Sequence, residues 1–103
     1  MKKQQGDVII RSVDSIPAGS LRVERTLRGL VLAQGEATGH AHRIEQDGAS
    51  LYEKDGVLYI KVDKPVQVEH EEHEPISLSV GIYTVGHVRE FDPFKEETRW
   101  IRD

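Results

Sequence analysis

Two short histidine-rich segments are the part of this chain best suited to chemistry. Four of its five histidines fall into tight pairs, His40-Ala41-His42 and His70-Glu71-Glu72-His73. Imidazole is a common ligand for zinc, iron, nickel and copper. Residues two apart on a strand point to the same face, so a strand through His40 and His42 could aim both rings at one point. We therefore predict a site for a divalent transition metal: zinc, nickel, iron or manganese.

The predicted ligand set begins with His40 and His42. His70 or His73 would join them, and the further candidate ligands are Glu45 and His87. Three protein ligands would leave a position open for water or substrate, whereas four would close the site and suggest a structural role. The sequence leaves both cases open. It also leaves open a simpler interpretation, in which the carboxylates around His70 and His73 stabilise protonated imidazoles in a solvated acidic loop.

Composition excludes several other functions. The chain has 103 residues, a net charge of -4 and no cysteine, so thiolate metal sites, disulfides and a cysteine nucleophile are excluded. The acidic balance argues against nucleic-acid binding, although Arg22, Arg25 and Arg28 could form a small anion-binding patch. No apolar run approaches the roughly 20 residues of a membrane span. We expect one domain over residues 1–103 in a soluble, cytoplasmic protein.

The elements that must position the histidines are short strands separated by turn residues. Residues 7–13 are rich in β-branched side chains, residues 21–24 alternate between apolar and charged, and residues 30–33 are continuously apolar, which is typical of a fully buried strand. Residues 40–44 form the next expected strand. Val66 and Val68 alternate with polar residues, and Ile76, Leu78 and Val80 repeat that pattern. Continuing the inward face of Val66 and Val68 would turn His70 inward.

A β-hairpin is the sharpest local prediction. Residues 50–54 and 57–62 flank Asp55-Gly56, a pair that suits a type I′ turn because both central residues need positive φ. Near the C-terminus, residues 92–97 could form a short helical turn. Trp100 and Ile101 should dock on the body of the domain or on a second subunit. Roughly eight short strands predict an all-β barrel or sandwich.

The spacing of the histidines resembles the first motif of the cupin superfamily. The matching residues are Gly35, His40, His42, Glu45 and Gly48, followed by Gly81 and His87 for the second motif. The resemblance implies a jelly-roll-like β-barrel in which two histidines, the glutamate and a later histidine bind a divalent metal. In this chain Glu45 follows the histidines more closely than usual, the proline before Gly81 is missing, and His70 and His73 have no counterpart. The chain also resembles small bacterial and phage proteins with Gly-His-Ala-His and His-Glu-Glu-His segments.

Three functions remain after these observations. The first is a small metal-binding β-protein. The second is a cupin-like metalloenzyme that acts on a small polar molecule, for which the sequence offers no independent acid, base or nucleophile. The third is a protein-interaction module without metal. The apolar Trp100 and Ile101 near the end of the chain also predict a homo-oligomer, with a dimer favoured because twofold symmetry is common.

Overall fold

The protein is described here from a computed structural model, in which residues 1–35 and 37–88 are placed well enough to describe. These residues form ten β-strands and no α-helix. The strands are β1 (Lys2–Gln5), β2 (Val8–Val13), β3 (Leu21–Val23), β4 (Leu30–Gln34), β5 (Ala41–Ile44), β6 (Ala49–Lys54), β7 (Val57–Val62), β8 (Val66–Val68), β9 (Ile76–Leu78) and β10 (Gly81–His87). The predicted all-β class is therefore confirmed.

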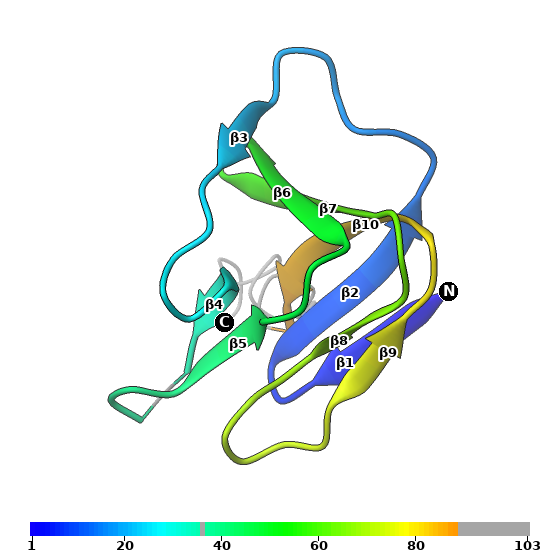
Figure 1. The fold of residues 1–103 in the computed structure, drawn as a ribbon. Coiled ribbons are helices and arrows are strands. Elements are labelled where there is room, and N and C mark those ends of the chain that lie inside the picture. Colours follow the sequence, from blue (N-terminus) through cyan, green and yellow to red (C-terminus); the bar gives the residue numbers. More distant parts are fainter. Residues whose placement is uncertain (36, 89–103) are drawn as a thin grey trace, which may run out of the picture.

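Six strands form one antiparallel sheet in the order β1-β2-β10-β7-β6-β3. The remaining strands form two antiparallel pairs, β4–β5 and β8–β9, which lie with the β1–β2 turn at the lower end of the molecule in Figure 1. The hydrogen-bonded order of the sheet runs from β1 to β3 without closing on itself within the described residues. A closed barrel or jelly-roll-like form accordingly stays a prediction.

One apolar core joins the sheet to the two strand pairs. Ile10 and Ile60 from the sheet are fully buried, and so are Ile44, Val68 and Leu78 from the pairs. Burial of each such side chain contributes roughly 1.5–3 kcal/mol. The core thereby holds β5 and β8 against the sheet. β5 contains His42, and β8 leads into the segment with His70 and His73.

The predicted hairpin is confirmed. β6 and β7 pair with Lys54 opposite Val57, which leaves Asp55 and Gly56 as a two-residue turn. Their φ angles are 52° and 82°, both in the left-handed region that a type I′ turn requires. The inward alternation of Val66 and Val68 is also confirmed, because both are buried in β8.

Several burial predictions were wrong. The apolar run of β4 is not fully buried: Leu30 and Leu32 face the core while Val31 and Ala33 are only partly covered, because successive side chains of a strand point to opposite faces. Leu21 lies on the edge strand β3 and is 72% exposed. Val80 lies beyond the end of β9 and is 63% exposed, so the alternation stops at Leu78.

Strand β1 was not predicted, because its polar sequence gives no apolar alternation. The predicted helical turn at residues 92–97 and the docking of Trp100 and Ile101 lie outside the described residues. Among the residues that are described, no helix is long and apolar enough to cross a membrane.

Candidate metal centre

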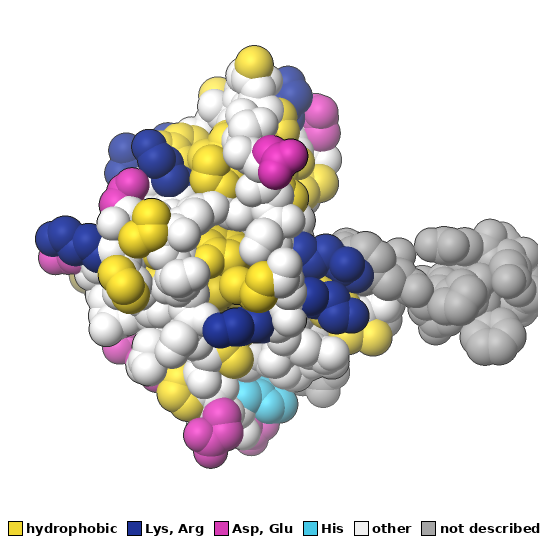
Figure 2. Space-filling view, turned by 90° about the vertical axis from the view of Figure 1, so that its right-hand side faces the viewer, with side chains coloured by type: hydrophobic (Ala, Val, Ile, Leu, Met, Phe, Trp, Pro, Cys, Tyr) yellow, Lys and Arg dark blue, Asp and Glu magenta, His cyan; other side chains and the backbone are white. Residues whose placement is uncertain are grey.

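Three loops meet at one hollow of about 240 Å³ at the end of the sheet. The β4–β5 connection and the start of β5 supply His40 and His42, the loop after β8 supplies His70 and His73, and the β1–β2 turn supplies Asp7. In Figure 2, histidine surface lies beside acidic side chains at the lower end of the visible face. The lining residues are Gly6, Asp7, Gly35, Ala37, His40, His42, His70, Glu72 and His73.

Backbone pairing fixes the two histidine segments relative to each other. Arg43 and Glu69 exchange both backbone hydrogen bonds, at 3.0 and 2.7 Å, so the residue after His42 is paired with the residue before His70. An irregularity between Val31 and Ala33 in β4 places Ala33 opposite His42. The predicted strand does not include His40, which precedes β5, whereas His42 lies within it; both residues line the hollow.

The four imidazole rings are packed together. The His70 ring centroid lies 4.3 Å from that of His42, 4.7 Å from that of His73 and 5.7 Å from that of His40. The His42 and His73 centroids are 6.1 Å apart. Four imidazoles around one zinc ion, with Zn–N distances of about 2.0–2.1 Å, would place neighbouring centroids about 5 Å apart. The ring spacings bracket that value.

His42 is the most constrained of the four. It is 2% exposed, and its Nδ1 lies 2.8 Å from Oε1 of the buried Gln5. Burial lowers the pKa of His42 from 6.5 to about 4, and the nearby His70 contributes to the same shift. At neutral pH His42 is therefore an uncharged imidazole, which is the form that binds metals.

His70 and His40 have different hydrogen-bonding environments. The backbone N–H of Glu72 donates to Nδ1 of His70 at 3.0 Å, and burial also lowers the pKa of His70. Nδ1 of His40 is buried and makes no hydrogen bond with any described residue. The nearest carboxylate oxygen, from Glu72, lies 3.8 Å away. Nδ1 of His40 could thus bind a metal without loss of an existing hydrogen bond. Nδ1 of His70 could do so only if its hydrogen bond with the Glu72 N–H were broken.

Glu71 fastens the second histidine loop to the first. Its Oε1 accepts the backbone N–H of Ala41 at 3.0 Å, and its Oε2 pairs with the Arg28 guanidinium and, at 3.3 Å, with Arg43. The Ala41 hydrogen bond, followed by the Arg28 and Arg43 contacts, lowers the pKa of Glu71 to about 2. Glu71 is therefore ionised and already neutralised by protein groups.

One set of ligand atoms is already close. Within the described ranges, single donor atoms of His40, His70 and Glu71 lie within 4.8 Å of one another. Glu71 is the weakest member of this set as a ligand, because a metal would compete there with Arg28, Arg43 and the Ala41 amide. The imidazoles have no arginine partners in the described part of the chain that would compete with a metal ion.

Two glycines leave the space that the rings occupy. A Cβ added at Gly6 would lie 2.8 Å from Nε2 of His73, and one added at Gly35 would lie 2.8 Å from Cβ of His40 and 2.9 Å from Nε2 of His70. Contacts this short would force the rings to move. Both glycines are therefore part of the shape of the hollow.

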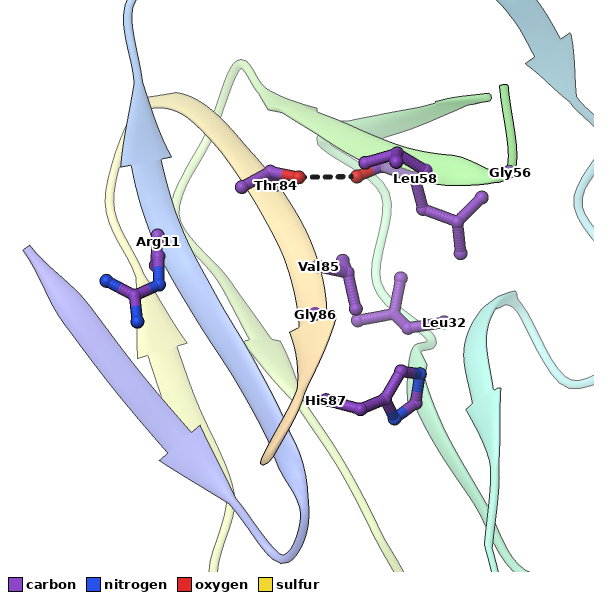
Figure 3. Close-up of a pocket in the computed structure, with 9 residues that line it drawn as sticks. Arg11, Leu32, Gly56, Leu58, Thr84, Val85, Gly86 and His87 are labelled. Atoms are coloured by element: carbon purple, nitrogen blue, oxygen red, sulfur yellow. Dashed lines mark hydrogen bonds between the residues drawn. The ribbon is translucent and has the colours of Figure 1, made fainter. Parts of the chain in front are cut away.

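The structure does not bring Glu45 or His87 into the same lining. Glu45 is exposed and pairs with Nε of Arg43 at 2.7 Å, beside a separate surface hollow formed by the β3–β4 connection. His87 lies at the end of β10 in another pocket, shown in Figure 3, where its ring is beside Leu32. Its Nδ1 is 3.8 Å from Oδ2 of Asp7, a residue that lines the histidine hollow.

Sequence reasoning missed Gln5, Gly6 and Asp7 as parts of this site, whereas Gly35 was named as a motif residue and does line the hollow. Gly6-Asp7 joins β1 to β2 as a two-residue turn, with Gln5 opposite Val8. Gly-Asp between two extended segments is a recognised hairpin signal, so the turn could have been found. No local signal marks Gln5, because its partners are residues 42, 68 and 74.

Comparison with known families gives one result. A family model with the description Domain of unknown function (DUF8820) matches residues 4–87. The chain belongs to this family. The matched region begins just before Gln5 and ends at His87, so the family domain contains the whole histidine hollow. No curated protein and no solved structure matches the chain.

Proposed function

We propose that this protein binds a divalent transition metal in the hollow formed by His40, His42, His70 and His73. The observation that carries the proposal is the gathering of four imidazoles from two distant segments, in which four of the six ring pairs have centroid spacings of 4.3 to 6.1 Å. Histidines that occur in a surface loop by chance would be solvated and separated from one another. Here one of them is buried and held neutral.

The ring orientations indicate what binding would require. The His42 and His73 rings are nearly parallel, with 12° between their planes, rather than edge-on around one point. Ligation of one ion by both residues would therefore require their rings to rotate. An all-imidazole set suits zinc, nickel or iron, and mixed sets with carboxylate oxygen would suit manganese.

The hollow is open to solvent, which leaves room for an exchangeable ligand. A metal held there by three imidazoles would act as a Lewis acid or activate a water molecule. This would support the alternative of a cupin-like metalloenzyme acting on a small polar molecule. Asp7 and Glu72 are the carboxylates on the lining of the hollow. A four-imidazole site would be structural.

The direct test is metal analysis of protein purified without a histidine tag, followed by calorimetric titration with zinc, nickel, iron(II) and manganese. We expect micromolar or tighter binding of at least one metal at one ion per chain. His42→Ala and His73→Ala should each weaken binding about ten-fold or more. His87→Ala is the matched control and should leave the affinity unchanged. Absence of binding for all four metals would refute the proposal.

A metal-free interaction module is the second candidate function. It is supported by the exposed apolar side chains Leu21 and Leu27, 72% and 108% exposed, beside the edge strand β3. Edge strands invite pairing with another chain. Failure of the metal titration would favour this candidate.

We further propose that the chain forms a homo-oligomer in the cytoplasm, most simply a dimer. The support is the apolar Trp100 and Ile101 in the sequence and the open edge of β3. Light scattering at micromolar concentration should give about twice the chain mass of 11.7 kDa. A monomeric mass would refute this, and a dimer that persists after deletion of residues 99–103 would place the interface elsewhere.

A further inference from the structure

Gln5 makes more specific contacts than any other uncharged side chain near the hollow. It is 3% exposed and lies at the end of β1. Its Nε2 is 2.9 Å from the backbone oxygens of both Val68 and Glu74, and its Oε1 is 2.8 Å from Nδ1 of His42. Every hydrogen-bonding atom of the amide thus faces a partner.

These partners determine which end of the amide is which. Carbonyl oxygens only accept hydrogen bonds, so the atom that faces both Val68 and Glu74 must be the NH₂ group, which has two hydrogens to donate. The opposite atom is then the amide oxygen, which can only accept. Nδ1 of His42 must therefore carry the hydrogen in this contact.

The consequence falls on the other ring nitrogen. A neutral imidazole carries one hydrogen, so Nδ1–H leaves Nε2 of His42 with a free lone pair. In metalloproteins the hydrogen bond made by one ring nitrogen likewise fixes the orientation and tautomer in which the other binds metal. His70 shows the contrasting case, because its Nδ1 already accepts the Glu72 N–H.

We infer that Gln5 is the positioning residue of the proposed metal site, holding His42 as the Nδ1–H tautomer so that Nε2 is presented as the anchoring ligand. The role of Nε2 as a metal ligand rests on the proposed function, whereas the assignment of the tautomer does not. Gln5 has a second effect through the same amide. By holding the carbonyls of Val68 and Glu74, it ties both ends of the His70–His73 loop to the strand that supports His42.

Three variants separate these effects. Gln5→Met keeps the length of the side chain and removes both the acceptor and the donors. Gln5→Glu keeps an oxygen for Nδ1–H but sets its other oxygen against the two carbonyls, so it loses the tie to the loop and places a carboxylate beside His42. Gln4→Met is the matched control, since Gln4 is exposed and its amide donates to Gly6 of its own hairpin.

The primary measurement is the ¹⁵N-detected tautomer of His42 in the metal-free protein at neutral pH, with the resonances assigned by their loss in His42→Gln. We expect Nδ1–H in the wild type, in Gln5→Glu and in Gln4→Met, and a shift toward Nε2–H in Gln5→Met. Zinc titration of the same proteins should show affinity about ten-fold or more lower for Gln5→Met and unchanged for Gln4→Met.

The outcomes distinguish the two proposals. An Nε2–H tautomer in wild-type His42 would overturn the inference whether or not zinc binds. So would a Gln5→Met protein that keeps the wild-type tautomer and zinc affinity. If Gln5→Met fails to fold, the wild-type and Gln5→Glu tautomers still decide the assignment. An Nδ1–H tautomer in a wild-type protein that binds no metal would leave the assignment standing and refute the proposed function instead.

Discussion

At the scale of single residues, the buried neutral His42 should make the folded protein sensitive to mild acid. Its pKa is lowered from 6.5 to about 4 in the folded state, so between these values the unfolded chain takes up a proton that the folded chain does not. Stability is then fully present above pH 6.5, falls as the pH drops toward 4 and levels off below that value.

The expected loss is on the order of 2 kcal/mol, after allowance for screening in a hollow that is open to solvent. It should be measured as the free energy of unfolding in urea at pH 7.0 and pH 4.5. His42→Gln should lose clearly less stability over this interval, because it removes the titrating group. Glu71 contributes little to the difference, because its stabilising effect is lost only as the pH falls from about 4.5 toward about 2, and it is present in both proteins. Equal losses in both proteins would contradict the assignment.

Gly35 provides a steric test of the same hollow. Gly35→Ala would place a methyl group 2.8 Å from Cβ of His40 and 2.9 Å from Nε2 of His70, so these rings must move apart. We expect metal affinity to fall about ten-fold or more, by analogy with other disruptions of ligand support. Gly39→Ala is the control: its φ of 85° makes an alanine strained, but its methyl group would meet nothing within 4 Å. Similar affinities for the two variants would argue against binding between His40 and His70.

At the scale of elements, the loop between β8 and β9 is held to the β4–β5 pair by the backbone bonds of Glu69 with Arg43 and by the side chain of Glu71. We predict that Glu71→Gln speeds hydrogen exchange of the Ala41 amide several-fold, because the charged acceptor and its arginine partners are weakened. Zinc affinity should fall as well, since His70 and His73 lose their anchorage. Amide exchange followed by NMR measures the first effect and calorimetry the second.

Glu72→Gln is the matched control for that experiment. Glu72 is the next residue along the loop, its side chain is 67% exposed, and its carboxylate lies 3.8 Å from His40 without reaching the β4–β5 backbone. Exchange of Ala41 should be unchanged in this variant. Acceleration in both variants would indicate that total charge of the loop, rather than the Glu71 contacts, governs its docking.

The same elements explain what the sequence could and could not predict. The β6–β7 hairpin was predictable because Asp55-Gly56 and the flanking residues encode it locally. The two histidine pairs were recognisable by spacing, but their meeting depends on the pairing of Arg43 with Glu69, which no local pattern encodes. Strand β1 escaped detection because its one buried side chain, Gln5, is polar and is satisfied only by residues 37 to 69 positions away.

At the scale of the whole molecule, metal binding should stabilise the fold, because the ligands come from segments that meet only when it is folded. Free metal at about 100 times the Kd would add about 2.7 kcal/mol. For a domain of this size that corresponds to a rise in Tm of about 10 °C or more. Differential scanning fluorimetry with zinc, and with EDTA as reference, measures the shift. His42→Ala should abolish it, and an equal shift in that variant would indicate adventitious binding.

The position of β10 in the sheet has a consequence for synthesis. β10 follows nine other strands in the chain, yet it lies between β2 and β7 and hydrogen-bonds to both. While the ribosome is still adding residues before 81, β2 lacks one of its two neighbours. The strand that carries the apolar side chains of Val8 and Ile10 therefore has one unpaired edge. The β1–β2 part and the β7–β6–β3 part of the sheet should therefore join only after residue 87 has left the exit tunnel. Until then, the emerging β2 is a natural target for chaperones that recognise extended apolar segments.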